Sequence, residues 1–344
     1  MRILVIGGTW FLGRAVVEDA LRQGWAVTTF NRGRSGSDVP GVEPIHGDRT
    51  DGDDLARLAS HGPWDAVIDT SAGELPPRAV LAGARALEPV TCQYVYISTA
   101  SVYAGWPDEP LRVGDAVLDG PPDADEDYGR NPAGWLGPNL HYGRQKAGAE
   151  RAVVTVFGPE RSWILRPGVI LGPGEYVGRL PWWLRRAVRG GRILAPGDPR
   201  KAIQPVDVRD VARFALGVAQ RTGGGVHNVT APIGRETMSD LLQLCLDTTG
   251  SDGQLEWVPD AVLLESGVTQ WTELPLWRTH EGVWLIDAST AYEVGLTCRP
   301  LAQTVADTWA WLQSGGLPVP HPRAAAHGIA PEKEAAILAT AARK

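Results

Sequence analysis

Short apolar runs alternate with helix-like segments along the first half of the chain, and this alternation constrains the fold most strongly. The apolar runs are Arg2–Ile6, Ala26–Phe30, Val42–His46, Asp65–Asp69, Gln93–Ser98 and Ser162–Arg166. The helical patterns between them are Leu12–Gln23, Asp53–Ser60, Pro77–Leu87 and Tyr142–Phe157. Strands that alternate with helices form β-α-β units, whose right-handed crossovers build a parallel sheet. The sequence therefore predicts an α/β fold with a doubly wound parallel sheet.

The alternation loosens in the second half, where proline and glycine become frequent. Further helical patterns lie at Leu180–Arg189, Val208–Gln220, Met238–Asp247 and Leu301–Leu312, and a strand pattern lies at Gly225–Thr230. We predict a first domain at 1–166 and a smaller α/β lobe formed mainly by 167–313, with some segments that return to the first domain. Residues 314–344 are predicted to form a linker and a tail helix at Pro331–Arg343, which docks on the body or frays. We interpret the arginines of the 180–189 helix as a solvated face.

Composition and charge exclude several classes of protein. The chain has no apolar run of about 18 residues and no basic leader with a cleavage site, so we expect a cytoplasmic protein without a membrane span. Its three cysteines, Cys92, Cys245 and Cys298, lie far apart, which argues against a disulfide framework or a metal site. The net charge of −7 does not favour nucleic acid as a partner.

A glycine-rich stretch, GGTWFLG, lies between the first predicted strand and the first predicted helix. Glycines at this place allow a tight turn and close approach of the backbone to phosphate, while the helix N-terminus offers N–H donors. This context favours a dinucleotide site of the Rossmann type over a simple glycine-rich turn. The expected contacts are Gly7, Gly8, Thr9, Trp10, Phe11, Leu12 and Gly13. Because Trp10 replaces the middle glycine of the motif, we expect its ring to turn away from the pyrophosphate, along the rim of the groove.

The residues after the second predicted strand bear on the choice of cofactor. Folds that bind NAD place Asp or Glu there, to accept from the ribose 2′-hydroxyl, whereas folds that bind NADP offer arginine. Here neutral Asn31 is followed by Arg32 and Arg34, which favours NADP(H), with NAD as the alternative. The competing interpretation is a solvated basic turn. Asp48, after the third strand, is a candidate adenine contact or a helix N-cap.

Hydroxyl side chains and a tyrosine–lysine pair form a candidate catalytic set. The strand end ISTASVY carries Ser98, Thr99 and Ser101, and the later segment HYGRQKAGAE places Tyr142 and Lys146 four residues apart on one helix face. A lysine beside a tyrosine disfavours the neutral phenol, which makes Tyr142 a feasible general acid and base near neutral pH. A threonine or serine hydroxyl from the strand end could hold the substrate oxygen.

Taken together, the chain resembles the extended short-chain dehydrogenases/reductases, the NAD-dependent epimerase/dehydratase superfamily. The resemblance runs from Arg2 to about Leu312, in the motifs GGTWFLG, GDRT, ISTASVY, YGRQK, LRPGVILGPGE and VDVRDVA. The combination of GGTxFLG, FNRG and LAPGDP is similar to a bacterial subgroup labelled reductase or epimerase, which is related to the chloroplast stem-loop-binding proteins. The resemblance implies that Thr99, Tyr142 and Lys146 are catalytic. It also implies cofactor contacts at Ser71, Ala72, Gly73, Ser98, Tyr142, Lys146, Pro167 and Val169.

The chain departs from this family at several positions. The separation between the Ser/Thr and the tyrosine is longer than in typical sugar epimerases, because the acidic loop Asp108–Asn139 is inserted. Ile203 stands where many relatives have an arginine that contacts the sugar-nucleotide phosphate, which argues against a nucleotide-sugar substrate. Ser101 stands where dehydratases of the family have a catalytic glutamate, which argues against 4,6-dehydration.

The expectation for function is an NADP(H)-linked oxidoreductase that acts on a carbonyl or alcohol of a small metabolite. Tyr142 would transfer the proton, Lys146 would lower the pKa of Tyr142 and bind the ribose, and Thr99 would hold the substrate oxygen. One alternative is a nucleotide-sugar epimerase with tightly bound NAD, and another is an RNA-binding protein on the same scaffold. The lobe at 167–313 would bind substrate, and the family suggests a homodimer.

Overall fold

The computed structural model describes residues 1–71, 73, 75–135, 139–317 and 327–341. Two compact units make up the chain. The first, here called the sheet unit, consists of Met1–Gly168, Val208–Thr230 and Leu285–Thr297. The second unit consists of Val169–Asp207, Ala231–Trp284 and Cys298–Lys344. Each unit is thus assembled from segments that are separated in sequence.

Seven parallel strands form the centre of the sheet unit, in the order β11-β6-β5-β4-β1-β2-β3. Their bounds are β1 Arg2–Ile6, β2 Ala26–Asn31, β3 Glu43–His46, β4 Trp64–Asp69, β5 Thr91–Ile97, β6 Ser162–Pro167 and β11 Gly225–Val229. The chain runs from β1 outward to β3 and then returns to the other side of β1 with β4. The predicted parallel α/β sheet is therefore confirmed, and the reversal creates a switch point between β1 and β4, where such folds bind ligands.

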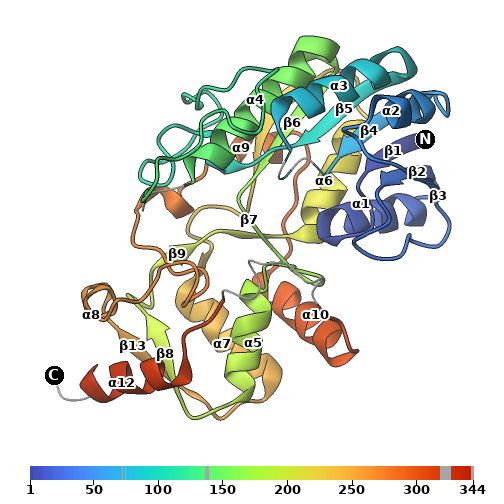
Figure 1. Cartoon of the computed structure of the whole chain (residues 1–344). Coiled ribbons are helices and arrows are strands. Elements are labelled where there is room, and N and C mark those ends of the chain that lie inside the picture. The colour runs from blue at the N-terminus through green and yellow to red at the C-terminus, as the bar shows by residue number, and fades with distance from the viewer. Residues whose placement is uncertain (72, 74, 136–138, 318–326, 342–344) are drawn as a thin grey trace. The chain divides into compact units, whose positions relative to one another are not determined.

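Helices cover both faces of this sheet (Figure 1). One face carries α1 (Phe11–Arg22) and α6 (Val208–Ala219), which pack against each other. The other face carries α2 (Gly52–Ala59), α3 (Pro77–Leu87) and α4 (Leu140–Phe157). The short helix α9 (Ser289–Glu293) packs against β11. Buried Val, Ile, Leu and aromatic side chains of the strands fill the space beneath α2, α3 and α4, as a doubly wound sheet requires.

The second unit contains three two-stranded sheets. Two of these pairs are parallel and one is antiparallel: β7 (Val169–Leu171) with β10 (Pro205–Asp207), β8 (Arg192–Pro196) with β13 (Gln254–Val258), and β9 (Ala202–Ile203) with β12 (Glu236–Thr237). The α-helices among its described residues are α5 (Arg179–Val188), α7 (Met238–Thr249), α8 (Asp260–Glu265), α10 (Leu301–Gln313) and α12 (Pro331–Ala341). Helix α5 packs against both α7 and α10.

The tail helix α12 is anchored to the second unit by a buried ion pair. Glu334 accepts hydrogen bonds from Arg186 Nε at 2.9 and 3.0 Å and from the Leu194 N–H at 3.1 Å. The side chains of Arg186 and Glu334 are only 6% and 7% exposed. The tail therefore docks, and the interpretation of this arginine as part of a solvated face is wrong, because Arg186 is buried under the tail.

The described residues show two further absences. No helix among them is long and apolar enough to cross a membrane. Within the same residues, no group of three His, Cys, Asp or Glu side chains is placed to hold a metal ion.

Candidate active site

The turn between β1 and α1 has the backbone that the glycine motif requires. Gly7 and Gly8 have φ angles of +107° and +104°, in the left-handed region that favours glycine. A Cβ added at Gly13 would lie 2.7 Å from the Gly8 nitrogen and 2.7 Å from Thr70 Oγ1. Side chains are thus excluded at these three glycines, and the turn lies directly against the first turn of α1.

The N-terminus of α1 fits a dinucleotide phosphate. Trp10 is the N-cap residue, with extended backbone, and no described side chain caps the helix. A helix N-terminus presents backbone N–H groups, and its dipole favours an anion at this place. Trp10 and Phe11 are half-buried, and Phe11 has an unusual φ of +34°. The side chains of Thr9 and Leu12 are buried, so ligand contacts of these two residues would be made by backbone.

An acidic residue that the sequence analysis missed, Asp38, contacts the last residue of β2. Asn31 donates from Nδ2 to Asp38 Oδ1 at 2.9 Å and accepts from the Gly33 N–H at 2.8 Å. The other carboxylate oxygen of Asp38 lies 2.8 Å from His46 Nε2, at the end of β3. A carboxylate from the following loop therefore stands beside the neutral strand-end residue, with a histidine as its partner.

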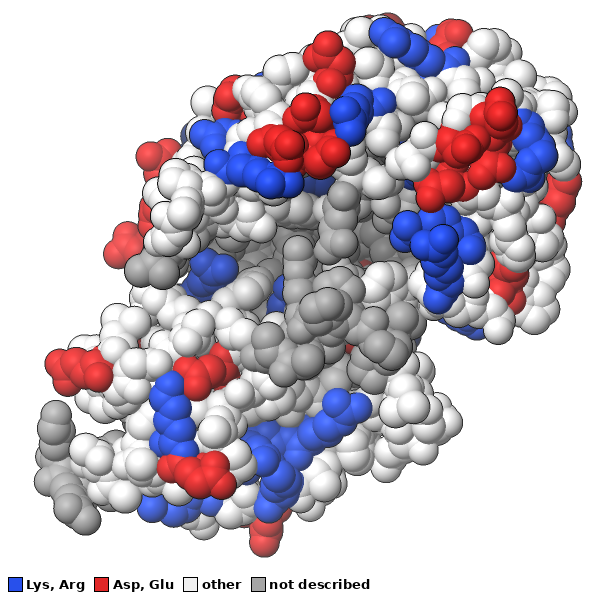
Figure 2. Space-filling view, viewed as in Figure 1, with Lys and Arg blue, Asp and Glu red and all other residues white. Residues whose placement is uncertain are grey.

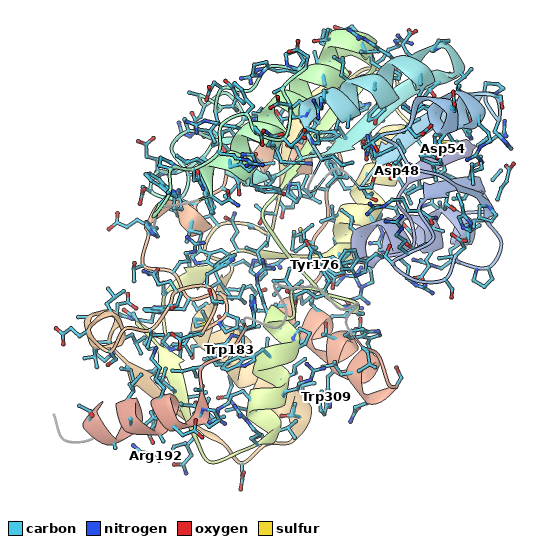
Figure 3. All side chains as sticks on the ribbon, in the orientation of Figure 1. Asp48, Asp54, Tyr176, Trp183, Arg192 and Trp309 are labelled. Atoms are coloured by element: carbon cyan, nitrogen blue, oxygen red, sulfur yellow. The ribbon has the colours of Figure 1, made fainter. Side chains whose placement is uncertain are left out.

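Arg32 and Arg34 are exposed, and their charges act on Asp48. Hydrogen bonds from Thr50 lower the pKa of Asp48, and the two arginines lower it further. The Asp48 N–H donates to Asp54 Oδ2 at 2.7 Å, and Figure 3 shows the two aspartates next to each other. The N-cap of α2 is Asp51, so the alternative role of Asp48 as a helix cap is wrong. The adenine contact stays a prediction.

The hydroxyl-bearing strand end lies against the first turn of α4. Thr99 Oγ1 accepts from the Ser101 N–H at 3.2 Å and begins a short 3-10 turn. A Cβ added at Gly143 would lie 2.3 Å from the Ser101 carbonyl oxygen, so only glycine permits this approach. The adjacent residue, Tyr142, is half-buried, and its N–H donates to the cap residue Asn139 at 3.1 Å. The structure thus brings the Thr99 turn and the Tyr142 turn together.

Lys146 lies one turn further along α4 and is almost fully buried. Its Nζ donates to the Ile97 carbonyl oxygen at 2.6 Å and lies 4.2 Å from the centroid of the Tyr96 ring. Burial lowers the pKa of Lys146 to about 7, although the charges of Asp69 and Glu150 act in the opposite direction. An ammonium that titrates near neutrality is therefore buried one helical turn after Tyr142.

Ser98 belongs to the interior of the sheet unit. Its hydroxyl donates to Glu150, which also receives a two-pronged ion pair from Arg166 at 2.9 and 2.7 Å. The hydroxyl is therefore engaged within the protein rather than offered to a ligand. Pro167 ends β6, whereas Val169 begins β7 of the second unit.

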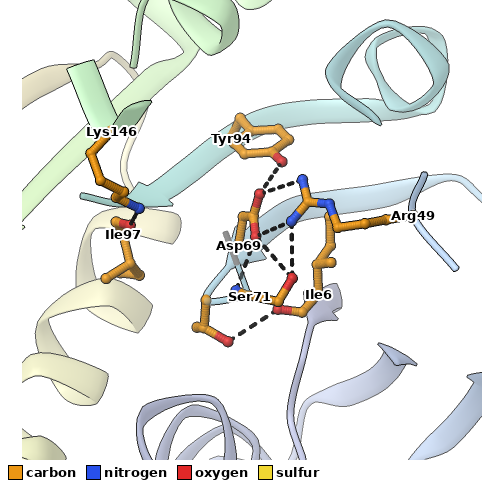
Figure 4. A network of polar contacts seen from close by, with 8 residues as sticks. Ile6, Arg49, Asp69, Ser71, Tyr94, Ile97 and Lys146 are labelled. Atoms are coloured by element: carbon orange, nitrogen blue, oxygen red, sulfur yellow. Dashed lines mark hydrogen bonds and ion pairs between the residues drawn. The ribbon is translucent and has the colours of Figure 1, made fainter. Parts of the chain in front are cut away.

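A buried network at the end of β4 also escaped the sequence analysis (Figure 4). Arg49 donates to both oxygens of Asp69 at 2.8 and 2.9 Å and to Ser71 Oγ at 2.9 Å. The Tyr94 hydroxyl donates to Asp69 at 2.8 Å. Ser71 is one of the predicted cofactor contacts, and Gly73, another predicted contact two residues further along the chain, is exposed. The predicted contact at Ala72 lies outside the described residues.

Comparison with known proteins gives a family match. The model of the NAD dependent epimerase/dehydratase family matches residues 3–234. A comparison with curated protein sequences finds no significant match. The finer subgroup with GGTxFLG and the relation to stem-loop-binding proteins stay predictions from sequence.

Solved structures share the fold at low identity. The Bordetella bronchiseptica enzyme WbmG in complex with NAD and UDP is 19% identical, with 92% of this chain and 96% of that chain covered and a TM-score of 0.67. UDP-glucose 4-epimerase from Thermotoga maritima with UDP-glucose is 20% identical, with 92% of this chain and 99% of that chain covered and a TM-score of 0.63. The Bordetella bronchiseptica enzyme WbmH in complex with NAD+ is 18% identical, with 92% of this chain and 99% of that chain covered and a TM-score of 0.67. With a family match over residues 3–234 and a glycine turn that fits a dinucleotide, the chain belongs to the NAD dependent epimerase/dehydratase family and is an NAD(P)-dependent enzyme.

Proposed function

We propose that the protein is an oxidoreductase that reduces a carbonyl group, or oxidises the corresponding alcohol, on a small metabolite. The observation that carries the proposal is the packing of the Tyr142 turn against the Thr99 turn, with a buried lysine one helical turn beyond. These three side chains are the parts that proton transfer to a carbonyl oxygen needs: an acid, a cation that tunes it and a hydroxyl that orients the substrate.

Each residue has a defined task in the proposed reaction. A bound nicotinamide cofactor would supply the hydride in reduction and accept it in oxidation. In reduction, Tyr142 gives its phenolic proton to the substrate oxygen, and the Lys146 ammonium stabilises the resulting phenolate. Thr99 Oγ1 accepts from the Ser101 N–H and donates to Ser101 Oγ at 3.4 Å, so its proton would exchange this long hydrogen bond for one to the substrate oxygen. In oxidation, the Tyr142 phenolate accepts the proton of the substrate alcohol.

We propose NADP(H) as the preferred cofactor. Exposed Arg32 and Arg34 follow neutral Asn31, and guanidinium groups are well suited to a 2′-phosphate. Asp38 opposes this preference, because its carboxylate stands beside Asn31, but His46 offsets the charge whenever the imidazole is protonated. The preference therefore depends on the arginines outweighing Asp38.

Direct titration of NADPH and NADH into the purified protein tests this choice. Arg32→Ala with Arg34→Ala should weaken NADPH binding at least about tenfold and leave NADH nearly unchanged, since only NADPH carries the 2′-phosphate. Asp38→Asn should strengthen NADPH binding. If wild-type protein binds NADH more tightly and the arginine variant loses neither cofactor selectively, the preference is wrong.

Substitution of the proposed acid tests the chemistry. Tyr142→Phe should reduce kcat about 10²- to 10⁴-fold across a panel of ketones and aldehydes, while cofactor affinity stays close to that of the wild type. Tyr292→Phe is the matched control, because it removes a hydroxyl of α9 that donates to the Thr230 carbonyl oxygen, outside the inserted loop and the second unit. Activity of Tyr142→Phe at the wild-type level would eliminate the proposed role.

We also propose that substrate selection rests on the second unit and on the inserted loop Asp108–Asn139. Two of the departures from the family lie in these segments, namely the insertion itself and Ile203. Exchange of the loop would then alter which carbonyl compounds are turned over without altering cofactor affinity.

A further inference from the structure

We propose that the buried ion pair of Asp69 and Arg49 keeps the side chain of Lys146 protonated during the reaction. Asp69 supplies the counter-charge, and Arg49 fixes the orientation of the Asp69 carboxylate. The inference rests on the proposed function, because Lys146 matters there as the partner of Tyr142. Asp69 and Arg49 would be positioning residues that act through Lys146.

Strand register places Asp69 beside the lysine site. Asp69 is the last residue of β4, is 0% exposed and pairs in register with Tyr96 of β5. The Lys146 ammonium lies over the ring of this same Tyr96, 4.2 Å from its centroid, and is tied to β5 through the Ile97 carbonyl. In Figure 4, Lys146 lies on one side of Asp69 and Arg49 on the other.

Arg49, Tyr94 and Ser71 hold the Asp69 carboxylate in one orientation. Arg49 donates to both oxygens, the Tyr94 hydroxyl donates to Oδ2 at 2.8 Å, and the Ser71 N–H donates to Oδ1 at 3.2 Å. Burial alone would raise the pKa of Asp69, but the Arg49 charge and these hydrogen bonds lower it below its ordinary value. Asp69 therefore remains a fixed anion at every pH at which the enzyme would work.

The surroundings of Lys146 contain few charges, so each one has a large effect. The charged and titratable groups around its ammonium are Arg49, Asp69, Tyr96, Tyr142 and Glu150. Glu150 is already committed to its bidentate partner Arg166. Loss of the Asp69 charge would leave the ammonium buried near the Arg49 guanidinium, and its proton would be released at lower pH.

The lysine content of the chain allows a direct measurement. Only four lysines occur, Lys146, Lys201, Lys333 and Lys344, so ¹³Cε-lysine NMR can follow Lys146 individually after assignment with Lys→Arg variants of the other three. Asp69→Asn, which keeps the shape of the side chain, should lower the titration midpoint of Lys146 by about one pH unit or more. In the same variant, the alkaline limb of the plot of kcat/KM against pH should also move to lower pH.

Two further variants separate charge from structure. Tyr94→Phe removes one hydrogen bond from the same carboxylate but no charge, so the Lys146 midpoint should move much less than in Asp69→Asn. Arg49→Gln combined with Asp69→Asn removes both charges and should restore the midpoint part of the way. The double variant also avoids an unpaired buried arginine, so it provides the comparison if Asp69→Asn does not fold.

The possible results distinguish this inference from the proposed function. An unchanged Lys146 midpoint in Asp69→Asn and in the double variant, or an equal change in Tyr94→Phe, would overturn the inference while Tyr142→Phe still abolished activity. A lowered midpoint together with an active Tyr142→Phe enzyme would support the ion pair and reject the proposed function.

Discussion

Gly13 shows how one residue can determine the shape of the turn between β1 and α1. Its missing side chain leaves room for Gly8 and Thr70, each with an atom 2.7 Å from the position a Cβ would take. The close approach of the glycine turn to α1, where we expect phosphate to bind, therefore requires that residue 13 has no side chain. The middle glycine of the usual motif is dispensable here, since Trp10 provides the N-cap with its backbone extended.

Gly13→Ala should lower cofactor affinity at least about tenfold, because the added methyl group forces the glycine turn away from α1. Titration of NADPH, followed by its fluorescence, measures the effect. Gly217→Ala is the control, because a Cβ on that residue of α6 meets no atom within 4 Å, so affinity should not change. An equal loss of affinity in both variants would contradict the account of the turn.

Lys146 makes a prediction about stability as a function of pH. Its pKa is about 7 in the folded protein and 10.5 in a model compound, so the unfolded chain binds more protons between these values. The resulting penalty on folding is complete below pH 7 and disappears as the pH rises towards 10.5. Relative to wild type, Lys146→Met should thus be more stable at pH 6 than at pH 9.5 in urea unfolding. An equal difference at both pH values would contradict a lowered pKa.

Sequence reasoning found the residues whose chemistry follows from local spacing. Gly7, Gly8 and Gly13, and likewise Tyr142 and Lys146, lie within one turn or one helix face of each other. A partner that is distant in sequence was missed, because nothing local links Arg49 to Asp69. The contact between Asn31 and Asp38 was missed because it depends on the path of the loop after β2. Such pairs depend on strand order and loop paths, which residue patterns do not contain.

Among the elements, those with a strong period were predicted well and short ones were not. The pattern at 77–87 matches α3, and the pattern at 2–6 matches β1, because each buries a long apolar face. The strands β9 and β12 have only two residues each and were not predicted. Elements of that length carry no readable alternation and are held by tertiary context.

The tail helix offers a test at the scale of elements. Glu334→Gln should destabilise the protein by about 3–5 kcal/mol, because it leaves the Arg186 guanidinium buried without its anion. Glu332→Gln, on the exposed face of α12, should change the free energy of unfolding by less than about 0.5 kcal/mol. Urea denaturation of both variants decides the matter, and equal stabilities would mean that the tail is not held by this pair.

At the scale of the whole molecule, the two units differ in which of the proposed site residues they contain. The sheet unit holds the glycine turn, the Thr99 turn and the buried lysine within a single compact body. Acidic and basic side chains are mixed on the face drawn in Figure 2, in keeping with a small net charge for a chain of this length. Such a surface gives no electrostatic reason to bind nucleic acid on that face.

The fate of the cofactor tests the central claim most directly. Purified protein is mixed with NADPH and a panel of carbonyl compounds, and absorbance at the reduced nicotinamide band is followed together with the identity of the bound cofactor by mass spectrometry. We predict net oxidation of NADPH that depends on the carbonyl compound and is abolished in Tyr142→Phe. NAD retained through purification, with no net consumption of NADPH under any condition, would contradict the account and favour an epimerase that oxidises and re-reduces its own substrate.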